Sequence, residues 1–372
     1  MISPTWLKRQ SLVRVEAPHG LACFARCSRS EEWIAAPNTP LIVDAHNDLL
    51  LELEQRRFEQ APFERYWLPN LQRGGVGLQV CPVFGSELEA LPELILRRNL
   101  LQVAAFQRAV RENAAHVIAV GSKADLDPIE RRERIGLMLS MEGAEALGYE
   151  TTLIDVFYEL GLRMVSLTWN RRNPFADGAA EPDGGGPLSN LGRELVDRIA
   201  GLGIVLDLVH ASERTFWDAI ERTTGPVCVS HAGCRTLLPT PRNLSDDQLR
   251  ALAGRGGVLG LMLLPIAIDP ESCRLERAVD HLDHAVSVMG IDNVGLGADF
   301  IAQVWRMLPV RAPADSLLPD GVPMDASLDG LEGPEHYPHL VELLRERGYE
   351  GERLAAILGG NWLRLLREAL PP

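Results

Sequence analysis

The chain has 372 residues, of which 46% are hydrophobic and 24% charged, a composition that excludes disordered, collagen-like and coiled-coil proteins. With 51 acidic and 37 basic residues, the formal net charge is −14. An acidic chain without a basic block is a poor partner for nucleic acids and for anionic membranes. No segment reaches the roughly 18 consecutive apolar residues that span a bilayer. We therefore expect no nucleic-acid partner and no membrane partner.

Residues 1–40 contain scattered prolines and no regular hydrophobic period, which predicts an irregular leader. A single domain is expected over residues 41–372. Lys8, Arg9 and the polar residues after them leave no uninterrupted apolar core, so this region does not resemble a secretory signal.

The six cysteines are scattered along the chain and do not form a disulfide framework. Cys23 and Cys27 have the spacing of half a zinc site, but no second pair of matching spacing follows. Cys81 and Cys228 lie in apolar runs and are expected to be buried thiols. This cysteine usage is typical of a reduced, cytoplasmic protein.

From residue 41 onward, short apolar runs alternate with helix-length segments. The runs that predict strands are 41–45, 76–83, 135–141, 163–168, 204–208, 226–230, 257–263 and 293–298. The segments that predict helices are 88–114, 189–201, 245–254, 274–289, 333–346 and 350–369. Near-continuous apolar strands joined by helices indicate a parallel sheet covered on both faces.

Eight such strands predict a (β/α)8 TIM-type barrel, with a doubly wound open sheet as the alternative. The stretches 172–188 and 303–330 are rich in Gly, Pro and Asp and predict long loops.

Histidines and carboxylates follow five of the eight predicted strands directly. They are Asp44, His46 and Asp48, then Glu142, then Asp207 and His210, then His231, and finally Asp299. Any one of them alone is typical of a helix cap or a turn. A barrel, however, brings the carboxyl ends of its strands to one mouth, where the active sites of this fold lie. The set therefore predicts a functional site.

The residue types point to metal chemistry. His46 and Asp48 are two residues apart, so they face the same side of an extended segment, and this donor pair suits zinc. Two further imidazoles come from neighbouring strands, and the two oxygens of Glu142 can bridge two metals. The predicted metal ligands are His46, Asp48, Glu142, His210 and His231.

Two ions about 3.5–4 Å apart would hold a bridging hydroxide as the nucleophile and polarise a carbonyl. Asp299 would accept and return protons.

Other motifs are weaker. The sequence has no phosphate-binding P-loop pattern, and the glycines over 254–260 precede a strand, which is the wrong context for a dinucleotide site. The acidic and histidine cluster over 280–284 lies in a helical segment and is expected to be structural or solvated. We expect the same of His336 and His339.

Taken in order, several segments of the sequence resemble the membrane (renal) dipeptidase family of binuclear zinc amidohydrolases. The segments are 43–48, 71–77, 141–143, 167–168, 173–177, 207–210, 229–231, 241–247, 295–300 and 359–362. The resemblance extends from about residue 41 to residue 369.

The resemblance implies a (β/α)8 barrel with two zinc ions and a small dipeptide substrate. It implies that His46 and Asp48 hold the first zinc and that Glu142 bridges to the second. The second zinc would be held by His210 and His231, with Asp299 as the acid/base. Arg242 matches a family arginine that meets the substrate, and its fork suits a carboxylate. A homodimer is implied by the resemblance alone.

Two positions depart from the family pattern. Trp169 stands where mammalian members have a histidine after the Leu-Thr pair, and an indole can neither titrate nor bind zinc. We expect Trp169 to border the substrate and to alter specificity or rate. Ile301 and Ala302 replace the Asp-Gly that follows Asp299-Phe300 in the family.

Three hypotheses follow. The first is a zinc dipeptidase, a metalloprotease that hydrolyses the single peptide bond of a dipeptide. The second is an amidohydrolase acting on another amide, such as a lactam, an N-acyl amino acid or a peptide-like biosynthetic intermediate. Trp169 and the altered loop after Asp299 motivate it. The third is a metal-binding homologue without catalysis. The presence of all five ligands and of Asp299 argues against the third.

Overall fold

The computed structural model describes residues 41–85, 91–181, 183, 185–307 and 325–372. The predicted leader, with Cys23 and Cys27, lies outside these residues, so it stays a prediction.

Each predicted apolar run overlaps a strand, and these strands are almost entirely buried. Their bounds are β1 Ile42–Asp44, β2 Val76–Phe84, β4 Ile135–Glu142, β5 Leu162–Ser166, β6 Val205–Asp207, β7 Val227–Ala232, β8 Val258–Leu261 and β9 Val294–Leu296. All of their pairings are parallel. The prediction of eight parallel strands is confirmed.

The sheet is closed. Its strand order is β2-β1-β9-β8-β7-β6-β5-β4, and β2 pairs in turn with β4, from Leu78 opposite Gly136 to Phe84 opposite Glu142. This last pairing makes the sheet a barrel and rules out the open doubly wound alternative. A ninth strand, β3 (Val117–Ala119), was not predicted, and it pairs with the first residues of β4.

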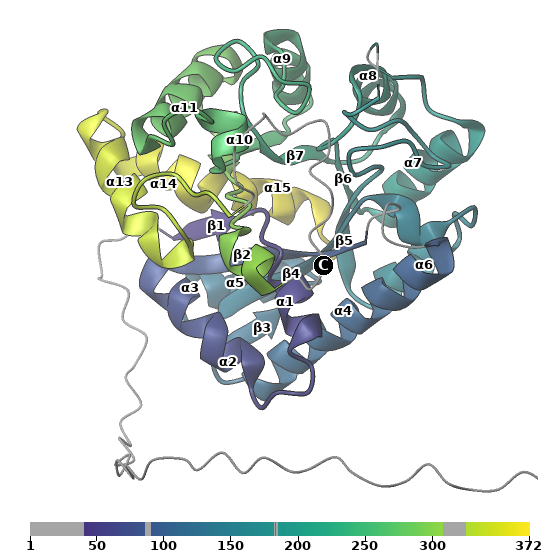
Figure 1. Cartoon of the computed structure of the whole chain (residues 1–372), viewed down its shortest axis with the longest axis horizontal. Coiled ribbons are helices and arrows are strands. Elements are labelled where there is room, and N and C mark those ends of the chain that lie inside the picture. The colour runs from purple at the N-terminus through teal and green to yellow at the C-terminus, as the bar shows by residue number, and fades with distance from the viewer. Residues whose placement is uncertain (1–40, 86–90, 182, 184, 308–324) are drawn as a thin grey trace, which may run out of the picture. The chain divides into compact units, whose positions relative to one another are not determined.

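Helices surround the barrel (Figure 1). Their bounds are α1 Leu49–Gln55, α2 Pro62–Tyr66, α3 Leu68–Gly74, α4 Pro92–Glu112, α5 Leu126–Glu130, α6 Leu153–Glu159, α7 Asn190–Leu202, α8 Glu213–Arg222, α9 Asp246–Gly254, α10 Pro265–Ile268, α11 Leu275–Met289, α12 Ala302–Met307, α13 Tyr337–Glu346, α14 Gly351–Ala355 and α15 Asn361–Ala369. Serine side chains accept hydrogen bonds from backbone amides at the starts of α7, α8 and α9, as expected for N-caps. None of the described helices has the length and apolar character needed to cross a membrane.

One helix prediction and one loop prediction need correction. The segment 350–369 is not one regular helix, because a π-helical turn over Ala356–Gly360 separates α14 from α15. The predicted loop 303–330 is wrong at its start, where α12 forms. This helix is held against α1, since the Gln303 side-chain amide donates to Glu52 Oε2 at 2.7 Å. Glu52 is buried and also accepts from Arg56 at 2.7 Å. Residues 308–324 lie outside the described residues.

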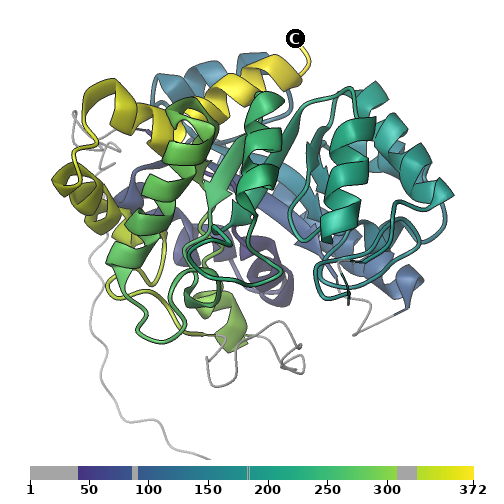
Figure 2. The same cartoon turned by 90° about the horizontal axis from the view of Figure 1, so that it is seen from above.

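The C-terminal helix lies across one end of the strands (Figure 2). Trp362, which is 1% exposed, donates from its indole N–H to the Leu296 carbonyl at 3.0 Å. Asn361 donates to the carbonyls of Ile291 and Val294 at the amino end of β9, both at 2.7 Å. Gly295 leaves room for the indole, because a Cβ there would overlap it. This end of the barrel is therefore filled, and the strands' carboxyl ends are left for a site.

Candidate active site

Six predicted side chains come together at the carboxyl ends of the strands. His46 and Asp48 follow β1, Glu142 ends β4, His210 follows β6, His231 lies in β7 and Asp299 follows β9. Each of these residues is at most 8% exposed. Five strand ends, far apart in sequence, thus form one buried polar cluster.

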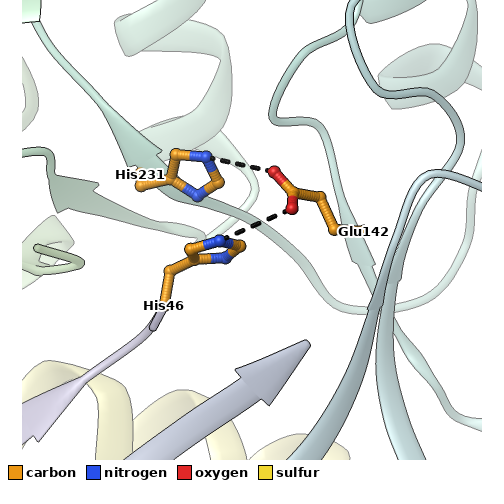
Figure 3. Close-up of side chains that lie close together, drawn as sticks. All are labelled: His46, Glu142 and His231. Carbon is orange, nitrogen blue, oxygen red and sulfur yellow. Dashed lines mark ion pairs between the residues drawn. The ribbon is translucent and has the colours of Figure 1, made fainter. Parts of the chain in front are cut away.

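Glu142 lies at the centre of three imidazoles. Its Oε1 is 2.8 Å from His210 Nε2 and 3.6 Å from His231 Nε2, whereas its Oε2 is 3.7 Å from His46 Nε2. Figure 3 shows His46 and His231 facing different oxygens of the carboxylate. A carboxylate in this position can contact two ions at once.

The described residues form two groups that can hold a metal ion. One is His46, Glu142 and His231, and the other is His46, Asp48 and Asp299. In the second group, His46 Nε2 is 3.8 Å from Asp48 Oδ1 and 3.8 Å from Asp299 Oδ1.

The cluster over 280–284 belongs to neither group, in agreement with its prediction as structural. His281 there accepts a hydrogen bond from the Cys234 amide, and His284 pairs with Asp246.

The electrostatics of the cluster call for a cation. Burial lowers the pKa of His46 to about 3 and holds those of His210 and His231 well below their usual value, so the imidazoles are neutral. Burial also raises the pKa of Asp48 to about 7. For Glu142 and Asp299, burial and then the nearby Asp48 charge raise the pKa well above its ordinary value.

His46 Nε2 and Asp48 Oδ1 are moreover buried without a hydrogen-bond partner. Neutral imidazoles, closely spaced carboxylates and ligand atoms without hydrogen-bond partners fit a divalent metal. This set of nitrogen and oxygen ligands suits zinc.

Two of the histidines are oriented by side chains behind them. His210 Nδ1 lies 2.6 Å from Asn170 Oδ1, and His231 Nδ1 lies 2.9 Å from Ser230 Oγ. Such contacts turn the opposite nitrogen, Nε2, towards the site. These roles of Asn170 and Ser230 were not predicted. Asn170 follows the fourth apolar run. The sequence pattern marks only histidines and carboxylates after the strands as ligands, so it does not mark this amide.

Two site residues have left-handed backbone conformations, His210 and Asp299, each with φ 59°. The His210 carbonyl accepts from the Ala179 amide at 2.8 Å and from the Thr168 hydroxyl at 3.3 Å. The Asp299 amide donates to the His46 carbonyl at 3.1 Å. Non-glycine residues rarely adopt this conformation, because it is higher in energy for them. It persists where contacts with the surrounding structure hold the backbone in place.

Arg242 and Trp169 border the cluster. Arg242 Nη2 lies 3.1 Å from His210 Nε2, and burial lowers the pKa of the guanidinium to about 10. The half-buried Trp169 ring has its centroid 6.1 Å from that of His210 and 5.2 Å from that of Phe84. A cation and an aromatic face are therefore available beside the candidate metal ligands.

Comparison with known proteins decides the family. The sequence profile of the membrane dipeptidase family, peptidase family M19, matches residues 36–308. The chain belongs to this family. The resemblance seen in the sequence is thus confirmed, and so is the class of enzyme, a metal-dependent hydrolase of peptide bonds.

Individual relatives of this M19 chain are distant in sequence. It is 29% identical over 292 residues to dipeptidase tcpJ of Claviceps purpurea. The aligned region covers 77% of this chain and 64% of that protein. It is 28% identical over 347 residues to dipeptidase aclJ of Aspergillus oryzae, and this alignment covers 87% of the present chain and 77% of the relative.

One structural relative is a metallopeptidase from Rhodobacter sphaeroides bound to a phosphinate mimic of L-Ala-D-Ala. Its TM-score is 0.75 at 23% identity, over 89% of this chain and 100% of that one, which supports the barrel fold.

Proposed function

We propose that this enzyme hydrolyses dipeptides with a pair of zinc ions at the mouth of the barrel. The proposed ligands are His46 and Asp48 for the first ion, His210 and His231 for the second, and Glu142 for both. The observation that carries the proposal is the position of Glu142, whose two oxygens face different buried imidazoles. When bound, two such metal ions activate a water molecule as the nucleophile and polarise the scissile carbonyl.

Asp299 is proposed as the acid/base. Its Oδ1 lies 3.8 Å from His46 Nε2, on the β9 side of the cluster. Burial and the Asp48 charge hold its pKa well above the ordinary value, so this carboxyl can take up a proton and return it to the leaving amine nitrogen.

Arg242 and Trp169 are proposed to bind the substrate. The Arg242 guanidinium can form two parallel hydrogen bonds with the terminal carboxylate of a dipeptide. The Trp169 ring, packed edge-to-face with Phe84, offers an apolar surface to a substrate side chain. Because an indole stands here, an amide other than a dipeptide is the second candidate substrate.

We also propose a cytoplasmic setting, which the free thiols of Cys81, Cys228 and Cys234 support, since all three are buried. Analytical ultracentrifugation tests the homodimer that the family resemblance implies.

The test is hydrolysis of a dipeptide panel with L- and D-residues at the C-terminal position, together with N-acyl amino acids and lactams. The R. sphaeroides relative binds a mimic of an L,D-dipeptide, so both stereoisomers are needed. Zinc-loaded protein is compared with chelator-treated protein and with Glu142→Ala. The matched control is Glu133→Ala, which removes an exposed carboxylate instead of the buried one.

The proposal expects dipeptide turnover by the wild type and by Glu133→Ala, and none by Glu142→Ala or by metal-free protein. Turnover confined to the other amides would select the second candidate. No turnover of any substrate by protein that holds two zinc ions would refute hydrolysis. Arg242→Ala is expected to raise KM by about 10–100-fold, the cost of a lost charge-assisted hydrogen bond.

A further inference from the structure

The carboxylate of Asp44 joins the ends of β1 and β9. Its Oδ1 accepts a hydrogen bond from the Ala298 amide at 2.9 Å and from the His46 amide at 3.3 Å. One oxygen thus connects the segment that carries His46 with the residue immediately before Asp299. Asp44 is fully buried.

The carboxylate of Asp207 makes the same pattern between β6 and β7. Its Oδ1 accepts from the Ser230 amide at 2.9 Å and from the Val209 amide at 3.1 Å. The residues that follow these two amides are His231 and His210. Asp207 is 5% exposed, so water cannot readily replace these bonds.

Each pair of strands supplies a different half of the site. β1 and β9 lead to His46, Asp48 and Asp299, which form one metal-capable group, and His46 also belongs to the other group, with Glu142 and His231. β6 and β7 provide His210 and His231, whose Nε2 atoms lie 3.1 Å apart. The two aspartates therefore act on separate groups of site residues.

We propose that Asp44 and Asp207 are positioning residues, each fixing the spacing of two neighbouring strand ends and hence the geometry of one half of the metal centre. Neither belongs to a metal-capable group among the described residues. The inference rests on the proposed two-metal function. It requires only an acceptor oxygen at each position, so asparagine can replace either aspartate, whereas alanine leaves two buried amides without partners.

The experiment titrates cobalt(II) into metal-stripped full-length protein and follows visible absorption, which reports the number and geometry of ligands. The variants are Asp44→Ala, Asp44→Asn, Asp207→Ala and Asp207→Asn. Each alanine variant is expected to bind one ion as the wild type does and the other about 10–100-fold more weakly, with an altered spectrum. The asparagine variants are expected to recover both the affinity and the spectrum.

His231→Ala identifies the half that each aspartate serves. This substitution removes a ligand of the second half, so adding Asp207→Ala should leave the affinity for the remaining ion unchanged. Adding Asp44→Ala should weaken it. The matched control is Asp218→Ala, which removes a carboxylate that accepts from the Leu188 amide but does not adjoin the site ligands. It should leave both affinities unchanged.

Folded alanine variants with wild-type affinities and spectra would overturn the inference, and so would asparagine variants as weak as alanine. If an alanine variant does not fold, the leucine variant replaces it, since leucine matches the size of aspartate but has no acceptor oxygen, and wild-type binding by that variant overturns the inference equally. If the wild type binds no metal, the proposed function fails together with the inference. If the wild type binds two ions and every variant does the same, only the inference fails.

Discussion

Trp362 closes the end of the barrel opposite the site, and its removal should cost stability without changing the chemistry. The side chain is 1% exposed, so Trp362→Ala takes nearly its whole apolar surface out of the core. About 200 Å² at roughly 25 cal/mol per Å² gives an upper value of about 5 kcal/mol. Measured losses for such truncations are about 3–5 kcal/mol, and we expect this range.

The lost hydrogen bond should add little. The Leu296 carbonyl that accepts from the indole also accepts from the Ala45 amide at 3.1 Å, so no orphaned acceptor remains. Trp362→Phe therefore keeps most of the packing and should cost only about 1–2 kcal/mol. The difference between the two variants separates the packing contribution from that of the hydrogen bond.

Urea denaturation of the zinc-loaded wild type and variants, at one zinc concentration, measures both losses from the midpoints and slopes. Zinc content and kcat at a temperature where all three proteins are folded should be unchanged, because the Ala45 amide keeps its bond to the Leu296 carbonyl and Asn361 still holds the amino end of β9. A loss below about 1 kcal/mol for Trp362→Ala would refute the packing argument. Equal losses for both variants would show that the hydrogen bond, and not the packing, dominates.

Three further predictions concern the site and its support. Asn170→Ala should weaken metal binding by about 10–100-fold, because His210 loses its Nδ1 partner, while Asn170→Asp should preserve binding in a chelator competition. Gly297→Ala should destabilise the fold by about 1–3 kcal/mol in urea denaturation, since a Cβ would overlap the Ser230 carbonyl oxygen. Glu52→Ala should cost about 1–3 kcal/mol in the same assay, because Arg56 keeps only Glu59 as a carboxylate partner and the Gln303 amide loses its carboxylate acceptor, and it should also lower kcat by loosening α12 after Asp299. Unchanged chelator competition, stability or kcat would contradict the respective argument.

The strands were predictable because burial on both faces requires apolar residues at consecutive positions, and the runs are long enough to show it. β3 was missed because two of its three residues are partly exposed, and because it lies outside the closed barrel and pairs with the start of β4. Closure of the barrel could not be predicted from local pattern. It depends on the pairing of β2 with β4, which a sequence shows only through the number of strands.

For the site, charged residues after strand ends were a strong signal, since the fold brings those positions together. Asn170 gave no such signal, because amides are common in turns. Arg242 was found only through the family resemblance, as it lies in a turn between β7 and α9. The left-handed conformations of His210 and Asp299 have no sequence mark either, because neither residue type requires that conformation.

These left-handed residues explain why the site needs its supporting hydrogen bonds. After β6 and β9 the chain must turn a side chain into the barrel mouth, and both turns use a conformation that costs about 1–2 kcal/mol for a residue with a Cβ. The bonds from Ala179 and Thr168 to the His210 carbonyl, and from the Asp299 amide to His46, hold that conformation in place. The precision of the centre thus comes from backbone contacts between adjacent strand ends. It follows that Thr168→Val, which removes a hydrogen bond to the His210 carbonyl and not to the His210 side chain, should still alter the geometry of the second half of the site.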